Sequence, residues 1–249
     1  REKLYLPVAL HVHSVDCQLI EMGIYALGQM VIDVNQLLNS AEIELVGRIV
    51  DASNASLFCK VGEVNAIYKP IAGERPLWDF PDGHLAWREV AAYAVSEALN
   101  LNCVPLTVLR DGPFGEGSLQ LWIDDVEDVG ERYLEQSKAL RKIALLDAVI
   151  NNTDRKIGHL LYKGGAIMGC DHGVTFHEEY KLRTVLWQFA DLPLTDEELA
   201  KLRNFQVDLS GLLTESEISA LHNRIATLLQ EGKFPLPPTD WPAIPWPPF

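Results

Sequence analysis

The spacing of apolar and polar positions divides the chain into a strand-rich first part and a mainly helical second part. After a leader strand, the apolar run at residues 18–38 predicts a helix. From residue 42 the pattern changes, and short strands are predicted in succession at residues 43–51, 57–61 and 64–68. These strands predict that the first part of the chain is built on a sheet.

One helix and two further strands are predicted to complete this first part. Residues 85–99 place apolar side chains at helical spacing. Residues 104–109 and 119–123 predict strands, and the stretch between them is rich in Gly and other turn residues. The expected order is therefore strands, one helix, and strands again.

The second part is predicted to be mainly helical and to end in an extended tail. A long helix is expected at residues 133–151. Two later helices open with capping boxes that begin at Thr195 and Thr214, each with a Glu three residues on. The segment 232–249 holds seven of the chain's 14 prolines, which predicts a polyproline-type extension rather than a helix or an interior strand.

A predicted hairpin lies between the long helix and the two capped helices. Residues 159–162 and 166–170 predict two short strands, and Lys163-Gly164-Gly165 between them is a turn signal. Because a hairpin returns the chain to its starting end, we expect His159 and Asp171 to lie together at its open mouth.

The residues around this hairpin match what phosphoryl transfer requires. That reaction needs one carboxylate to orient or deprotonate the attacking hydroxyl and another to hold the magnesium that bridges the nucleotide phosphates. Asp154, with Arg155 beside it, lies on the loop that enters the hairpin mouth, and Asp171 follows the hairpin. His159 is a potential second metal ligand. Asp147 is expected to be structural and to hold this loop.

Other interpretations of the same residues stay open. Asp154 and Arg155 also fit an Asx turn with a structural Arg, and His159 also fits a core histidine. His172 and His177 could form a metal cluster with Asp171, although no established zinc spacing is present.

The strand at residues 64–68 leads directly to a candidate phosphate-binding lysine. Lys69 follows this strand, and Glu89 lies 20 residues later on the predicted helix. In phosphoryl transfer such a Lys contacts the nucleotide phosphates while the Glu holds it in place. The polar loop before the second strand offers Ser53, Asn54 and Ser56 as a cover for the phosphates. A surface Lys and Glu and an ordinary hairpin loop are the alternatives.

Composition limits the partners and the compartment. The 249 residues carry 21 Lys and Arg against 35 Asp and Glu, so the net charge is −14. This balance argues against binding to nucleic acid or to anionic membranes. No apolar stretch approaches the roughly 20 residues of a membrane span. The four cysteines are widely spaced, which favours free thiols in a reducing compartment, and we expect a cytoplasmic protein.

Several segments, in the right order, resemble the phosphatidylinositol 3-/4-kinase-like branch of the protein-kinase-like fold, most closely the type II phosphatidylinositol 4-kinases and their actinobacterial relatives. The similar segments are SLFCK at 56–60, YKP at 68–70, RE at 88–89, GSLQLWI at 117–123, DAVINNTDR at 147–155 and DHG at 171–173. The resemblance implies an α+β, bilobal protein-kinase-like fold, with an N-lobe at 42–125 and a C-lobe at 126–231. Residues 1–41 and 232–249 would then be extensions.

The resemblance also assigns roles. It implies a kinase that uses ATP with Mg²⁺ or Mn²⁺ and transfers phosphate to a hydroxyl of a lipid, a protein or a small molecule. Lys69, Glu89, Asp154 and Arg155 would be catalytic, and Asp171 and His159 would bind the metal. The residues expected to bind the nucleotide are Ser53, Asn54, Ser56 and Lys69 at the phosphates, and Gln120, Leu121, Trp122 and Ile123 at adenine through their backbone.

Two departures from the resemblance leave other functions open. The family usually has Asn where His159 stands, and the segment GERPLWDFPDGH replaces a cysteine-rich insertion that anchors the lipid kinases. A nucleotide-binding pseudokinase is therefore one alternative. A scaffold that docks a protein partner through the Pro- and Trp-rich tail is the other, unless Trp241 and Trp246 pack on their own lobe.

Overall fold

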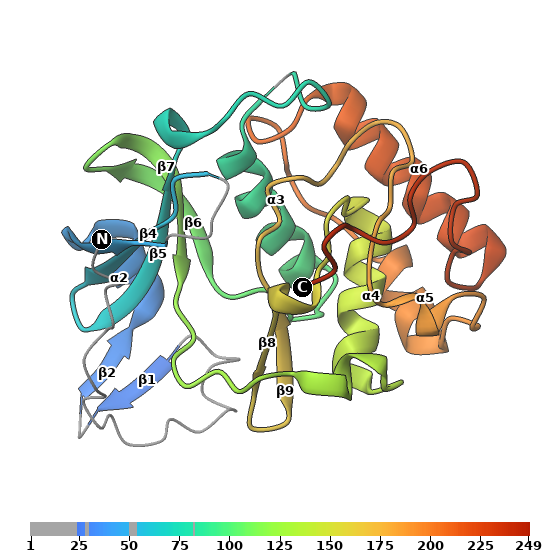
Figure 1. Cartoon of the computed structure of the whole chain (residues 1–249), viewed down its shortest axis with the longest axis horizontal. Helices are drawn as coiled ribbons and strands as arrows, with labels where there is room; N and C mark the ends of the chain where they lie inside the picture. The colour runs from blue at the N-terminus through green and yellow to red at the C-terminus, as the bar shows by residue number, and fades with distance from the viewer. Residues whose placement is uncertain (1–23, 28–29, 50–53, 82) are drawn as a thin grey trace.

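The structure is a computed structural model that describes residues 24–27, 30–49, 54–81 and 83–249. Its largest sheet has five antiparallel strands in the order β3-β4-β5-β7-β6. The strand bounds are Ile43–Arg48 (β3), Leu57–Val61 (β4), Val64–Pro70 (β5), Thr107–Gly112 (β6) and Gly115–Leu121 (β7). This sheet lies in the left part of the molecule in Figure 1, and the helices labelled α3, α4, α5 and α6 lie to its right.

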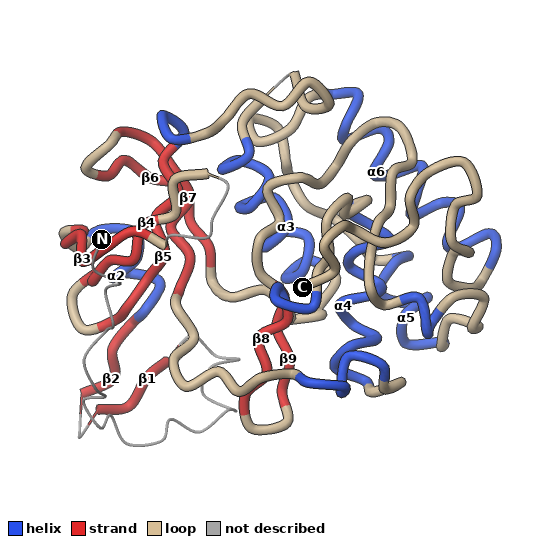
Figure 2. Tube along the Cα trace, in the orientation of Figure 1, coloured by secondary structure: helices blue, strands red, loops and turns tan. Residues whose placement is uncertain are grey.

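Four longer helices and the β8–β9 hairpin are the main regular elements of the described chain after the sheet. The helices are α3 (Leu85–Ala98), α4 (Lys138–Ile150), α5 (Asp196–Arg203) and α6 (Glu215–Glu231). The hairpin pairs β8 (Leu160–Lys163) with β9 (Ala166–Gly169). Short 3-10 helices lie at Ile71–Gly73 (η1), Gly130–Leu134 (η2), Ile157–His159 (η3) and Trp187–Phe189 (η4). Figure 2 shows the separation of the strand-rich part from the helical part, which confirms the predicted α+β, bilobal architecture.

The predicted helix at residues 18–38 is wrong over most of the part that is described. Ile24–Leu27 (β1) and Met30–Asp33 (β2) form an antiparallel hairpin, and the helix α2 covers only Val34–Ser40. Two properties of the sequence explain the difference. Both strands contain β-branched residues, which favour extended backbone, and Asp33 caps α2 by accepting a hydrogen bond from Gln36 N at 3.0 Å. Residues 18–23 lie outside the described residues.

Two other predicted boundaries also differ. The predicted helix at 133–151 begins only at Lys138, because the Ser137 hydroxyl accepts a hydrogen bond from Leu140 N at 3.3 Å and caps the helix there. The turn-rich stretch 111–118 is mostly strand, since β6 and β7 continue pairing up to Gly112 and Gly115. The two predicted capping boxes are present at the starts of α5 and α6.

The described residues form two hydrophobic clusters. The smaller cluster joins α2 to one face of the sheet and contains Ala66 and Tyr68 of β5. The larger cluster joins α3, α4, α6 and the β8–β9 hairpin. Because neighbouring residues of a strand point to opposite faces, Ile67 and Lys69 point to the other face of the sheet. That face is turned toward α3, which packs on β6 and β7. The alternation along β5 therefore directs Lys69 toward the helical part.

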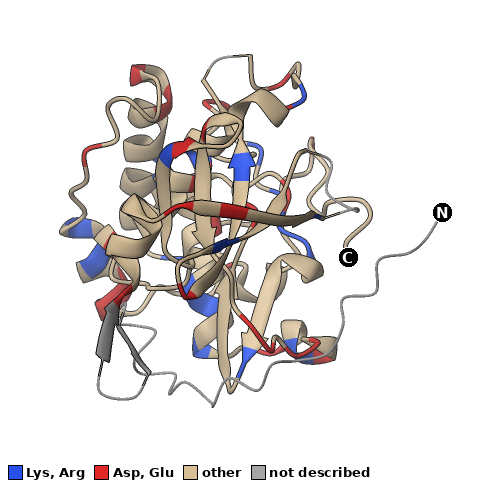
Figure 3. Ribbon diagram, turned by 90° about the vertical axis from the view of Figure 1, so that its left-hand side faces the viewer, with Lys and Arg blue, Asp and Glu red and all other residues tan. Residues whose placement is uncertain are grey.

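Charged residues are spread over both parts of the molecule. Figure 3 shows Asp and Glu on strands and helices alike, with Lys and Arg among them. Among the described residues, no helix is long and apolar enough to cross a membrane.

Candidate active site

Lys69 connects the sheet to the first long helix. Its ammonium donates a hydrogen bond to Glu89 Oε1 of α3. Glu89 is buried, and its other oxygen, Oε2, accepts a hydrogen bond from the backbone N–H of His172 at 2.9 Å. Glu89 thus holds both Lys69 and the residue that follows Asp171, and the predicted Lys69–Glu89 pair is present.

Lys69 also contacts Asp171, which lies 102 residues away in the sequence. The Nζ–Oδ1 distance is 2.9 Å, so the sheet and the helical part meet at this ion pair. Burial alone would lower the pKa of Lys69, but the charges of Asp171 and Glu89 outweigh burial and raise it. The charge of Lys69 in turn holds the pKa of Asp171 below its ordinary value, against the opposing effect of burial. Both groups are therefore charged at neutral pH.

The β8–β9 hairpin brings His159 to Asp171 as the sequence predicts. Leu160 pairs with Gly169, and the N–H of Cys170 donates to the carbonyl of His159 at 3.0 Å. His159 Nε2 lies 3.4 Å from Asp171 Oδ2. Burial lowers the pKa of His159 to about 4, so the imidazole is neutral at pH 7 and can bind a metal ion.

Asp154 lies on the loop between α4 and η3, and the structure places it in the same electrostatic neighbourhood. Burial raises the pKa of its carboxyl group above the ordinary value, and the negative charge of Asp171 adds to this effect. Lys156 opposes it, with Nζ 3.4 Å from Asp154 Oδ2. The loop is held from within, because Asn152 Oδ1 accepts a hydrogen bond from Asp154 N at 3.0 Å.

Arg155, predicted to be catalytic, is enclosed within the fold. Its guanidinium is fully buried and pairs with the buried carboxylate of Asp147 at 2.9 Å. It also donates to the carbonyl of Cys170 at 2.8 Å and lies 2.7 Å from His172 Nε2. A guanidinium enclosed in this way cannot touch a substrate. Arg155 instead joins the loop of Asp154 to α4 and to the segment that carries Asp171, and Asp147 is the buried partner of this arginine.

The segments proposed to bind the nucleotide are described in part. Ser53 lies outside the described residues. Asn54 Oδ1 accepts a hydrogen bond from Arg75 N at 2.9 Å, and Ser56 is buried with its carbonyl bonded to Ile49 N. These contacts show how the loop is fastened, and a role in covering phosphates stays a prediction.

The predicted adenine-binding segment is the end of β7 and the residues that follow it. Leu121 N donates to Leu106 O at 2.8 Å, and Trp122 N donates to Asn65 O at 3.0 Å, so both amides are already used within the fold. The side-chain amide of Gln120 donates to Thr107 Oγ1 at 2.8 Å. Adenine would therefore meet carbonyl groups of this segment or the amide of Ile123.

The side chains at the hairpin mouth fit a divalent metal ion whose coordination shell is completed by nucleotide phosphates. The carboxylate of Asp171 suits Mg²⁺ or Mn²⁺, and the neutral His159 imidazole adds a nitrogen donor. Among the described residues, no group of three or more His, Cys, Asp or Glu side chains is placed to hold a metal ion. Magnesium at phosphotransfer sites takes one or two protein carboxylates and completes its shell with phosphates and water. The donor set therefore fits this kind of site.

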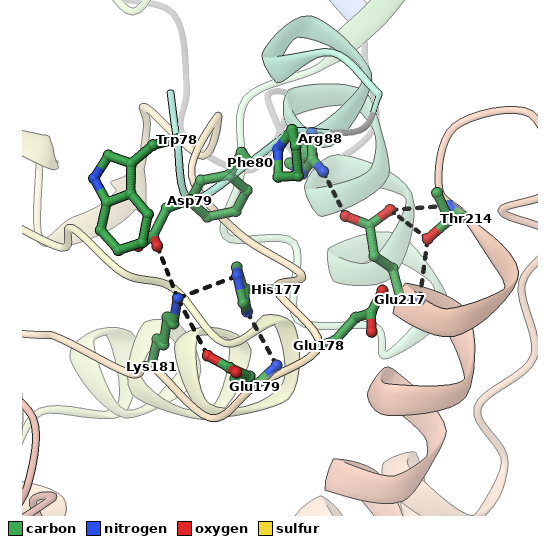
Figure 4. Close-up of a pocket in the computed structure, with 11 residues that line it drawn as sticks. Trp78, Asp79, Phe80, Arg88, His177, Glu178, Glu179, Lys181, Thr214 and Glu217 are labelled. Atoms are coloured by element: carbon green, nitrogen blue, oxygen red, sulfur yellow. Dashed lines mark hydrogen bonds and ion pairs between the residues drawn. The ribbon is translucent and has the colours of Figure 1, made fainter. Parts of the chain in front are cut away.

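A cavity of about 330 Å³ lies near the start of α3 and the start of α6 (Figure 4). On one side Arg88 of α3 pairs with Glu217 of α6 at 2.5 Å. On the other side Lys181 pairs with Asp79 at 2.9 Å, and Phe80 lies between the two pairs. Sequence reasoning missed these pairs, because each joins residues more than 100 positions apart and no local pattern marks them.

Comparisons with known proteins define the class of this chain. No family model matches the sequence. Protein Rv2133c of Mycobacterium tuberculosis (strain ATCC 25618 / H37Rv) is 38% identical over an alignment of 267 residues, which covers 87% of this chain and 96% of that protein. The chain therefore belongs to the family of protein Rv2133c, whose name states no function.

A solved kinase structure resembles this chain in its fold. The Golgi casein kinase matches with a TM-score of 0.56 and 14% identity over 88% of this chain and 75% of that chain. The Helicobacter pylori proinflammatory kinase CtkA covers 79% of this chain and 94% of its own, with 12% identity and a TM-score of 0.45. The first match confirms the kinase-like fold, and the phosphatidylinositol 3-/4-kinase-like branch stays a prediction.

Proposed function

We propose that the protein is an ATP-dependent phosphotransferase that moves the γ-phosphate to a hydroxyl acceptor. The observation that carries this proposal is the position of Lys69, whose ammonium contacts Glu89 of α3 and Asp171 at the hairpin mouth at the same time. A lysine from the sheet is thereby joined to a helix glutamate and to an acidic metal ligand, which is the arrangement that phosphoryl transfer uses.

Each residue would have a definite task in this reaction. Lys69, held by Glu89, would bind the α- and β-phosphates, and the carbonyl groups after β7 would meet adenine. Asp171 and His159 would hold the metal, which neutralises charge on the phosphates when it is bound. Asp154 would orient the acceptor hydroxyl and take its proton, and its raised pKa favours acceptance of that proton. Arg155 would keep the Asp154 loop in place.

Transfer of labelled phosphate tests the proposal. The protein is incubated with ATP labelled at the γ-phosphate and with Mg²⁺ or Mn²⁺, in separate reactions with lipid, protein and small-metabolite fractions. Label should appear in one fraction with the wild type and be lost with Asp154→Asn. Failure of the wild type to bind ATP and to transfer label to any fraction would contradict the proposal.

A second candidate function is that of a nucleotide-binding pseudokinase. It is favoured by His159, which stands where the resemblance expects Asn and which is a less usual magnesium ligand than an oxygen donor. In that case ATP would raise the thermal midpoint of the protein, but no labelled product would form with either metal.

Net charge and free thiols bear on the acceptor and on the compartment. We favour a soluble acceptor over a lipid, because the net charge of −14 repels anionic membranes. The described thiols Cys59, Cys103 and Cys170 are free, which is usual for a protein of a reducing compartment such as the cytoplasm. A protein partner that binds the Pro- and Trp-rich tail also stays a prediction.

A further inference from the structure

The tail from Trp241 to Phe249 lies against the segments that surround the candidate catalytic loop. The carbonyl of Ala243 accepts hydrogen bonds from Thr184 N at 3.1 Å and from the indole Nε1 of Trp187 at 2.7 Å. The carbonyl of Pro248 accepts one from Ile157 N at 2.8 Å. Figure 1 shows the end of the chain beside η3, the short helix that leads into β8. The tail is therefore fastened to the protein at two points around the catalytic loop.

Trp241 begins this tail and lies close to two cations. The Nζ of Lys181 is 5.4 Å from the centre of its ring, and the guanidinium carbon of Arg183 is 5.5 Å from it. Lys181 is itself buried, and it also lies 5.6 Å from the ring centre of Trp78, at the cavity described above (Figure 4). Aromatic rings and cations thus alternate from Trp78 through Lys181 and Trp241 to Arg183. We call these four side chains the aromatic–cation stack.

The stack ends on the backbone of the catalytic loop. Arg183 Nε donates to the carbonyl of Thr153 at 2.7 Å, and Arg183 N donates to the carbonyl of Asn152 at 2.9 Å. In the other direction, Arg155 N donates to the carbonyl of Arg183 at 3.1 Å. These bonds enclose Asp154 between two anchored neighbours. A change in the position of Arg183 must therefore move the loop that carries Asp154.

The other end of the tail meets the same loop at Ile157 and Gly158, three and four residues after Asp154. A Cβ atom placed on Gly158 would lie 3.9 Å from the carbonyl carbon of Phe249, so the two backbones are neighbours. The residue after Gly158 is His159, the candidate metal ligand. The tail therefore supports both the part of the loop that carries the base and the part that carries the metal ligand.

We propose that Trp241 is a positioning residue of the active site, and that through the aromatic–cation stack the tail holds the Asp154–His159 loop in its working geometry. This inference rests on the proposed function, because it assigns the tail to the same site. It also gives the tail a role within its own chain. Trp246 lies in the same tail but takes no part in the stack, and 89% of its surface is exposed.

The chemistry of Trp241 allows its packing to be separated from its interaction with the cations. No hydrogen-bond partner is found among the described residues for its buried indole Nε1, so Trp241→Phe keeps an aromatic face and breaks no such bond. Trp241→Leu keeps an apolar side chain but has no aromatic face to attract Lys181 and Arg183. Trp246→Ala is the matched control in the same tail.

The test measures the dissociation constant of ATP with Mg²⁺ and with EDTA for the full chain and these three variants, together with their thermal midpoints. The dissociation constant with EDTA divided by the one with Mg²⁺ gives the factor by which the metal strengthens ATP binding. This ratio reports how well the loop presents His159 and Asp171 to the metal, and it needs no knowledge of the acceptor. Trp241→Leu should reduce this ratio about fivefold or more, because two cation–π contacts are lost. Trp241→Phe and Trp246→Ala should stay within about twofold of the wild type.

Each other outcome is informative. An unchanged ratio in Trp241→Leu would overturn the inference and leave the proposed function standing. Equal weakening of ATP binding with and without Mg²⁺ would show that Trp241 serves only general packing, which also overturns it. A wild type that binds no ATP at all would overturn the proposed function itself.

Discussion

The buried ion pair between Arg88 and Glu217 gives a quantitative prediction about how the two parts of the molecule are held together. Arg88 stands next to Glu89 on α3, and Glu217 closes the capping box at the start of α6. Their side chains are only 3% and 7% exposed, and the shortest N–O distance is 2.5 Å. Arg88→Met therefore leaves the carboxylate of Glu217 buried without its cation.

The expected cost follows from that burial. Removal of one partner of a buried pair typically costs about 3–5 kcal/mol, since the remaining charge stays desolvated. For a chain of this size, one kcal/mol corresponds to a shift of roughly 2–4 °C in the thermal midpoint. Arg88→Met should therefore lower the midpoint by about 10 °C, and urea titration should show the same loss as a lower transition midpoint.

The protein contains a closely matched control. Arg141 pairs with Glu198, which likewise closes a capping box, but these side chains are 18% and 13% exposed and the N–O distance is 2.7 Å. Water screens this second pair more strongly, so Arg141→Met should cost about 1 kcal/mol. A loss in Arg88→Met no larger than that in Arg141→Met would refute the reasoning. The double variant Arg88→Met/Glu217→Gln should recover part of the loss, because the carboxylate that Arg88→Met leaves unpaired is then also removed.

Three further predictions concern the candidate site. Lys69→Met should weaken ATP binding about tenfold or more in a calorimetric titration, since Asp171 and Glu89 lose their shared cation; unchanged affinity would remove Lys69 from the site. Asp154→Asn should lower the transfer rate by about 10²–10⁴-fold while ATP affinity stays within about threefold, and a rate equal to that of the wild type would show that Asp154 is not the base. The third prediction uses the pKa of His159, which is about 4 when folded against 6.5 ordinarily. The unfolded chain therefore takes up a proton between these pH values that the folded protein does not, and stability is lost as the pH falls through this window. Urea titrations at pH 6.5 and pH 4 measure how much free energy of unfolding each protein loses between these pH values. The loss should be about 3 kcal/mol smaller in His159→Gln than in the wild type, and an equal loss in both proteins would contradict the prediction.

The features that were predicted from the sequence are those that depend on local patterns. The β8–β9 hairpin follows from the turn at Gly164 and Gly165, whose φ angles of +56° and +87° suit glycine. The capping boxes at Thr195 and Thr214 mark the starts of α5 and α6. Each box is also a local pattern, because the capping Thr and the Glu that completes the box are only three positions apart.

The alternation along β5 explains why the position of Lys69 could also be anticipated. A residue that follows an apolar strand must point to one of two faces, and Tyr68 already occupies the buried face on the side of α2. Lys69 therefore had to face the helical part, where Glu89 and Asp171 lie. That Lys69 meets both Glu89 and Asp171 was predicted because these residues follow one another in the order that phosphoryl-transfer enzymes of the kinase class use.

Contacts between distant segments could not be predicted in this way. The pair Arg88–Glu217 depends on how α3 packs against α6, and the pair Lys181–Asp79 depends on how the loop before α3 meets the loop after β9. Their residues look like ordinary surface charges in the sequence, which is the common case for Lys, Arg, Asp and Glu. The β1–β2 hairpin was missed for a related reason, since a short apolar run fits a strand or a helix equally well.

The most direct test of the central claim is the metal dependence of ATP binding in the wild type and in Asp171→Asn. Calorimetric titration with Mg²⁺ and with EDTA should show that Mg²⁺ strengthens binding to the wild type and has no such effect on Asp171→Asn. The variant should remain folded, as judged by its thermal midpoint. ATP binding that Mg²⁺ strengthens equally in both proteins, or a wild type that binds no ATP, would contradict the account.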